Sequence, residues 1–166
     1  MGVTDAFCRW LAATPLSHTI SSVEWIIPAV QTVHILAVAA VLTSVLMISR
    51  RLLQAGPGEP SMAWVARRFL PYIWWPLPVL LLTGATLIVG EPARALKNPV
   101  FYLKMGLLLA AVAVTLACQL PLRRDANYWH RGRLRRWAAW LVALAALLLF
   151  AGIAIAGRWI AYLQDA

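Results

Sequence analysis

The chain contains four long apolar stretches, at residues 25–48, 69–89, 99–120 and 137–160. A helix needs about 20 apolar residues to cross a bilayer, because each residue advances it by about 1.5 Å. None of the stretches alternates polar and apolar residues as a strand does, and backbone groups in hydrocarbon need partners within the chain. The sequence therefore predicts an all-α integral membrane protein, a single domain over residues 1–166 built as a four-helix bundle.

Composition supports this interpretation. Hydrophobic residues make up 62% of the chain and charged residues 13%, against about 45–50% and 25% in ordinary globular domains. So little polar surface cannot cover a core in water, which excludes a soluble globular protein and a disordered chain. The net charge of +9 would suggest nucleic acid in a soluble protein. Here the basic residues cluster between apolar stretches, as membrane topology demands, and no nucleic-acid partner is expected.

Local signals give the expected ends of these helices. Asn98 is a good N-cap and Pro99 suits the first helical position. Pro121 is expected to close the third helix, while Pro76 and Pro78 are expected to kink the second.

The segment before the first span has its own pattern. Residues 3–13 are amphipathic and Pro15 follows them. They predict a short interfacial helix at the N-terminus.

The arginines predict the orientation. Two of the loops are rich in arginine: Arg50, Arg51, Arg67 and Arg68 in one, and Arg123, Arg124, Arg131, Arg133, Arg135 and Arg136 in the other. Loops rich in Lys and Arg stay in the cytoplasm. Both termini are therefore expected on the outer side.

Polar groups inside the hydrocarbon are expensive and are candidate functional residues. His34 lies about 13 Å inside the first span, and Gln31 lies one turn outward on the same face. Lys104 lies about 8 Å inside the third span, and Arg158 lies near the outer end of the fourth. The expected topology places His34, Lys104 and Arg158 in one layer, where an anionic ligand would relieve the repulsion of three basic groups.

Structural alternatives exist for each of these residues. His34 and Gln31 could hydrogen-bond neighbouring helices. Lys104 could extend its amine to the outer interface, and Arg158 could serve as an interfacial anchor.

Several segments resemble known families. Residues 32–37 (TVHILA) and 50–53 (RRLL) look like the first helix of small four-helix bacterial membrane proteins, in which an intramembrane His precedes an inner Arg. Residues 98–105 (NPVFYLKM) resemble their third-helix opening, with its intramembrane Lys. Residues 13–17 (ATPLS) and 157–162 (GRWIAY) are similar to the two ends of an uncharacterised inner-membrane family of bacteria.

A more distant resemblance is to J-type protoporphyrinogen oxidase and to the copper-resistance D membrane domain. In the oxidase family, the first-helix His and third-helix Lys are associated with b-type haem or porphyrin. The resemblance therefore implies a cofactor at His34 and Lys104, with His34 as the metal ligand. Many relatives carry acidic residues where this chain has Gln31 and near Ser49. Without those acidic residues this chain lacks possible proton-transfer groups. The resemblance therefore favours cofactor binding over oxidase activity.

Three functions remain open from the sequence. The first is a redox or electron-transfer module in the bacterial inner membrane, with haem b or porphyrin at His34, Lys104, Arg158 and Gln31. Its electron partner would be quinone or a redox protein. The second is a non-enzymatic membrane subunit without cofactor, and the third is a copper-linked permease domain. Enzymatic activity and oligomeric state are left open.

Overall fold

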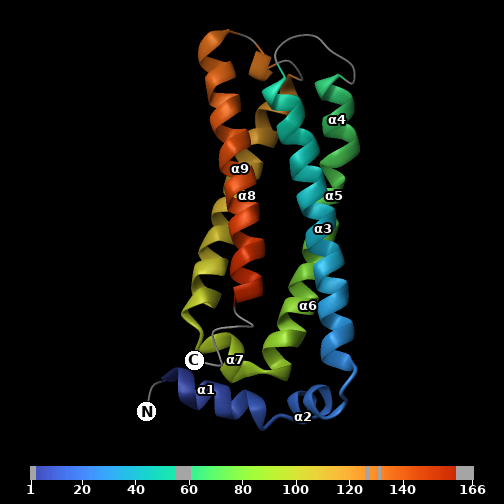
Figure 1. The fold of residues 1–166 in the computed structure, drawn as a ribbon, viewed down its shortest axis with the longest axis vertical. Helices are drawn as coiled ribbons and strands as arrows, with labels where there is room; N and C mark the ends of the chain where they lie inside the picture. The colour runs from blue at the N-terminus through green and yellow to red at the C-terminus, as the bar shows by residue number, and fades with distance from the viewer. Residues whose placement is uncertain (1–2, 55–60, 126–127, 131, 160–166) are drawn as a thin grey trace.

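The computed structural model describes residues 3–54, 61–125, 128–130 and 132–159, and these ranges form helices joined by short turns (Figure 1). The helices are α1 (Val3–Ala12), α2 (Pro15–Ser22), α3 (Ile26–Leu53), α4 (Met62–Phe69), α5 (Pro71–Trp74), α6 (Pro76–Gly90), α7 (Pro92–Leu96), α8 (Pro99–Arg124), the 3-10 turn η1 (Tyr128–His130) and α9 (Arg133–Trp159). The predicted all-α class is confirmed. Residues 56–60 between the first two spans, Arg131 and the expected end of the last span at Ile160 lie outside the described residues.

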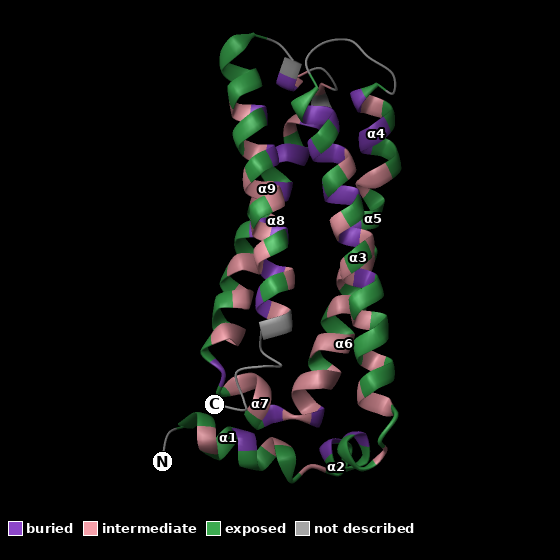
Figure 2. Cartoon of the chain, in the orientation of Figure 1, coloured by how far each residue is buried: buried purple, intermediate pink, exposed green. Residues whose placement is uncertain are grey.

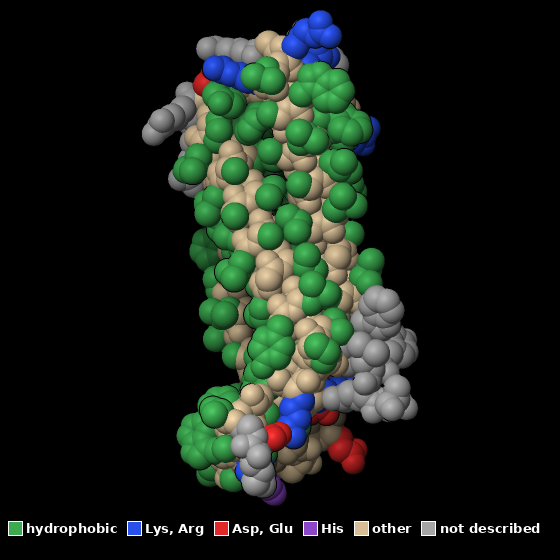
Figure 3. All heavy atoms as spheres, turned by 90° about the vertical axis from the view of Figure 1, so that its left-hand side faces the viewer, with side chains coloured by type: hydrophobic (Ala, Val, Ile, Leu, Met, Phe, Trp, Pro, Cys, Tyr) green, Lys and Arg blue, Asp and Glu red, His purple; other side chains and the backbone are tan. Residues whose placement is uncertain are grey.

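Four helical segments are long and apolar enough to cross a membrane: Ile26–Leu53, Met62–Gly90, Pro99–Leu122 and Arg133–Gly157. They run side by side along the long axis, and on the face drawn in Figure 3 apolar side chains cover the middle, with Lys and Arg near the two ends. A helix of 28 residues is about 42 Å long, more than the roughly 30 Å of bilayer hydrocarbon. The chain therefore has the build of a multi-pass membrane protein.

The second span is divided into α4, α5 and α6, whereas the sequence predicted one kinked helix starting near Phe69. The divisions fall at Pro71 and Pro76, each of which opens a new helix. A proline is tolerated at a first helical position because its missing N–H needs no partner there. Pro78 lies in the first turn of α6 and leaves that helix intact.

The prediction that Pro121 closes the third helix is wrong. α8 continues through Pro121 to Arg124, and the Pro121 carbonyl accepts a hydrogen bond from the Asp125 N–H at 3.0 Å. Pro121 lies in the last turn, so it removes one donor without preventing the remaining residues from staying helical.

Packing is concentrated at one end of the bundle, which we call the arginine-rich end because Arg50, Arg51, Arg67, Arg68, Arg133, Arg135 and Arg136 lie there. The buried residues of α3 run from Ala37 to Leu52, toward that end, and in α6 only Gly90 is buried (Figure 2). α3 packs against α4, α6 and α9, and α8 packs mainly against α9. The opposite half of the bundle, toward α1, α2 and α7, is therefore less tightly filled.

α1, α2 and α7 form a layer across that opposite end (Figure 1). α1 matches the predicted short N-terminal helix, while α2 was not predicted. Pro15 follows the first helix and opens the second. The cap of α2 is Thr14, whose hydroxyl accepts from the Ser17 N–H at 3.3 Å. The Ser17 hydroxyl donates to the Val89 carbonyl at 2.7 Å. Gly90 lies so close to α2 that a Cβ there would come within 2.8 Å of Ile20. This layer is thus fixed to the end of α6.

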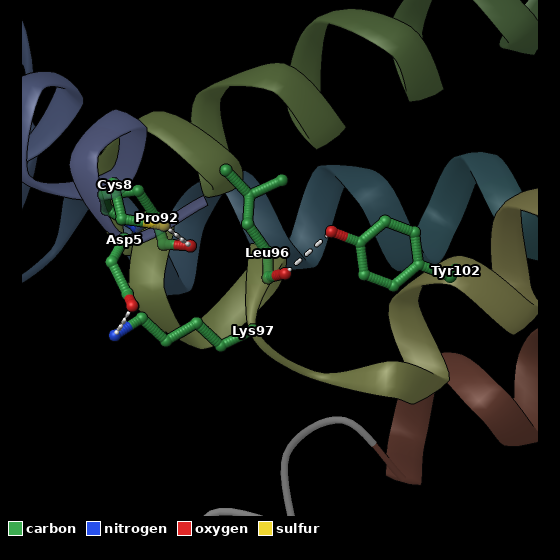
Figure 4. Close-up of polar contacts among 6 residues, drawn as sticks. All are labelled: Asp5, Cys8, Pro92, Leu96, Lys97 and Tyr102. Carbon is green, nitrogen blue, oxygen red and sulfur yellow. Dashed lines mark hydrogen bonds and ion pairs between the residues drawn. The ribbon is translucent and has the colours of Figure 1, made fainter. Parts of the chain in front are cut away.

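Polar contacts tie α1 to α7 and α7 to α8 (Figure 4). The Lys97 ammonium lies 2.7 Å from the Asp5 carboxylate, and this hydrogen bond raises the pKa of Lys97. The Cys8 thiol donates to the Pro92 carbonyl at 3.7 Å, and the Tyr102 hydroxyl donates to the Leu96 carbonyl at 3.0 Å. Because Lys97 is exposed, its ion pair adds little to stability.

Replacing Ser17 with alanine is expected to loosen α2. Ser17 is 3% exposed, and losing its bond leaves the Val89 carbonyl short of a donor at a cost of about 1 kcal/mol. Hydrogen exchange of the α2 amides should accelerate about fivefold. The control is Thr19→Ala, because the exposed Thr19 hydroxyl bonds only within its own helix, to the Pro15 carbonyl. Equal exchange in the two variants would contradict the assigned role of Ser17.

Candidate functional site

His34 lies on α3 with its Nδ1 atom 2.8 Å from the Thr83 hydroxyl of α6. That hydroxyl has a single proton, which it donates to the Val79 carbonyl at 2.6 Å. When the hydroxyl keeps that bond, it accepts from His34, and Nδ1 carries the ring proton. In a neutral imidazole this tautomer leaves the lone pair on Nε2. In that tautomer the site presents one nitrogen ligand.

Gly84 forms the wall beside this imidazole. A Cβ on Gly84 would lie 3.8 Å from the His34 Cε1 atom, which is ordinary contact distance. The ring therefore lies beside the α6 backbone at Gly84, with room for a methyl group there. The Thr83 hydroxyl is the polar contact that orients the ring.

Lys104 reaches the same region from α8. Its side chain is half-buried, and its Nζ atom lies 3.5 Å from where a Cβ on Gly157 of α9 would be. Lys104 also lies within electrostatic range of His34. The amine lies against α9, within electrostatic range of the His34 ring on α3.

The structure shows no contact of Gln31 or Arg158 with His34 or Lys104 among the described side chains. Gln31 is exposed on α3, one turn from His34. Arg158 belongs to the last turn of α9, directly after Gly157, and its side chain lies outside the described ones. The structure therefore assembles His34, Thr83, Gly84, Lys104 and Gly157 as the core of the candidate site.

The core of the site carries basic side chains, and no acidic residue lies in the four spans. All six acidic residues of the sequence, Asp5, Glu24, Glu59, Glu91, Asp125 and Asp165, lie outside the four spans. No carboxylate of the spans can neutralise Lys104, and an anionic ligand would do so. A lone basic group in an apolar layer is stabilised by such a ligand through a charge-assisted hydrogen bond.

If a b-type haem were bound here, His34 and Lys104 are the residues that would hold it. Histidine commonly serves as the single axial protein ligand of haem iron, and its other ring nitrogen is normally hydrogen-bonded, as Nδ1 is here. Lys104 suits a propionate. Copper held by protein side chains fits less well, because the described residues contain no group of three His, Cys, Asp or Glu close enough to share a metal.

Sequence reasoning missed the polar residues at the arginine-rich end. Gln119 of α8 is 4% exposed and accepts a hydrogen bond from the Trp74 indole of α5 at 2.9 Å. Thr115, Ser44 and Ser49 are also buried there. A single amide inside an apolar stretch was the available signal for Gln119.

The comparisons with known proteins identify a family. No curated protein and no solved structure matches the chain, so the likeness to J-type protoporphyrinogen oxidase and the copper-resistance D domain rests on the quoted segments alone. One family model matches residues 13–163, which covers α2 through α9 and includes both His34 and Lys104. The chain therefore belongs to a family of unknown function, DUF6644.

Proposed function

We propose that this protein binds haem b, or a closely related anionic porphyrin, in the half of the bundle next to α1, α2 and α7, and serves in membrane redox chemistry or electron transfer. The single observation that carries the proposal is the state of His34. Its Nδ1 atom lies 2.8 Å from the Thr83 hydroxyl, and in the tautomer that donates Nδ1–H to this hydroxyl the lone pair of Nε2 is left for a metal.

The surroundings of His34 support the same ligand. Lys104 approaches from the facing helix α8 and would pair with a propionate. In this half, α3 and α6 bury few of their own residues. Bound haem would supply one-electron chemistry. The chain would orient the haem, place the positive charge of Lys104 beside a propionate and shield the haem from water. Quinone or a redox protein would exchange the electrons.

We further propose that the protein lies in the bacterial inner membrane with the arginine-rich end in the cytoplasm and both termini in the periplasm. The support is the asymmetry of arginine between the two ends. The candidate site would then lie in the periplasmic half of the bilayer.

Titration with two porphyrins tests the proposal. Haem and metal-free protoporphyrin would each be added to detergent-purified protein, and to detergent alone, while the Soret band is followed. Haem is expected to bind about tenfold tighter or more, because only haem offers iron to His34. Lys104→Met is expected to weaken both porphyrins, since both carry propionates. Lys97→Met is the matched control, because Lys97 pairs with Asp5 outside the bundle.

Haem absorbance that matches the detergent blank would overturn the proposal. The non-enzymatic membrane subunit would then take its place, with His34 serving as an interhelical hydrogen-bond donor to Thr83.

A further inference from the structure

A groove lies at the arginine-rich end, on the other half of the molecule from His34. It is a groove of about 750 Å³ between α4–α5 and α8. Its lining includes Ala63, Arg67, Leu70, Trp74, Gln119 and Leu122. Ligand sites commonly have volumes of about 300–1,000 Å³. The groove is therefore large enough for a substantial part of an amphiphilic molecule.

The groove lies between two parts of the bundle. α4 and α5 pack against α3, whereas α8 packs mainly against α9. Across the groove, the Trp74 indole donates to the Gln119 amide oxygen at 2.9 Å. A buried amide is costly unless hydrogen-bonded, so this bond holds Gln119 in the wall and keeps Trp74 in place.

Charge and polarity vary along the groove. Arg67 lines it and is exposed on α4, while Leu70, Trp74 and Leu122 supply apolar wall. Arg67 and Trp74 are seven residues apart, or about 10 Å by helical rise. The groove thus offers a cation near the arginine-rich end and an apolar channel toward the middle of the bundle. Basic pockets between spanning helices are typical binding sites for anionic lipid headgroups.

From these features we propose that the groove binds one anionic phospholipid, with its phosphate on Arg67 and an acyl chain along Leu70, Trp74 and Leu122. A soluble phosphate compound fits less well, because apart from the paired Trp74 and Gln119 polar groups the rest of the wall is largely apolar. A neutral amphiphile would provide no negative charge to pair with Arg67. The bound lipid would cover the groove and connect α4–α5 with α8. This inference does not depend on haem binding at the other end of the bundle.

Native mass spectrometry of the detergent-purified protein tests the inference with phosphatidylglycerol and phosphatidylcholine of identical acyl chains. The wild type is expected to retain one phosphatidylglycerol and to prefer it by about tenfold, the scale of one charge-assisted contact. Arg67→Gln is expected to remove that preference. Arg68→Gln is the matched control, because Arg68 is the next residue of α4, carries the same charge and does not line the groove.

A third variant separates the groove from the charge. Ala63→Trp fills the groove and leaves Arg67 in place, so it is expected to displace the lipid. Circular dichroism would verify that the variant is folded. Retention of lipid by folded Ala63→Trp, or equal losses in Arg67→Gln and Arg68→Gln, would overturn the assignment to this groove. Equal binding of the two phospholipids, or displacement by millimolar inorganic phosphate, would overturn the anionic phospholipid as occupant.

Discussion

Replacing His34 with alanine is expected to abolish the Soret band of protein purified from haem-replete cells. The imidazole is the proposed ligand of the iron, and no other described side chain of the site offers a ring nitrogen. The fold should persist, because the variant loses only the Nδ1–Thr83 bond. Interhelical bonds of this kind contribute about 0.6 kcal/mol in membranes. Absorption and circular dichroism spectra of the same sample would separate loss of haem from loss of structure.

Gln31→Ala is the matched control for that variant. Gln31 is exposed one turn from His34 on the same helix, so its loss is expected to leave the Soret band intact. Thr83→Val tests the assigned tautomer, because valine keeps the shape and removes the acceptor of the Nδ1 proton. It is expected to weaken haem binding without abolishing it, since second-shell changes typically cost 10–100-fold in metal affinity. An unchanged band in His34→Ala would remove His34 as the ligand.

The second large effect concerns orientation. Cysteine introduced at Ser21, exposed on α2, is expected to react with a membrane-impermeant maleimide in intact cells whose outer membrane is permeable to it. Cysteine introduced at Gln54, exposed at the end of α3, is expected to react only after the inner membrane is opened. Native Cys8 and Cys118 are both buried and should stay unlabelled, so the unmodified chain serves as the background.

The buried Cys8 changes how this test is done. Cys8 precedes the first span and would otherwise be a natural outer-side label, but the residue is 4% exposed and its thiol contacts the Pro92 carbonyl. The introduced cysteines avoid that problem. Labelling of Gln54→Cys in intact cells, with Ser21→Cys protected, would reverse the proposed orientation.

The helical class and the number of spans could be predicted from the sequence because both follow from length and hydropathy. The start of α8 was also predictable, since Asn98 accepts from the Val100 N–H at 2.9 Å, as an N-cap does. The division at Pro71 was missed because the kink of the second span was assigned to Pro76 and Pro78. α2 was missed because its eight residues are short and weakly apolar.

The candidate site was predictable only in part. Depth along each helix predicts His34 and Lys104 in one layer, and in the structure the two side chains lie within electrostatic range of each other. Rotation about the helix axis was not predictable, because lipid is as apolar as a protein core and gives no hydrophobic face to orient by. The depth of Gln31 could therefore be predicted, but its exposure could not. The Thr83 bond and the Trp74–Gln119 bond depend on that same rotation.

The absorption spectrum of the wild-type protein, purified in detergent from haem-replete cells, tests the central claim most directly. A reduced-minus-oxidised difference spectrum would show whether haem is bound and whether its iron accepts an electron. We predict a Soret band and b-type difference bands at close to one haem per chain. A colourless protein that also takes up no added haem would contradict the account.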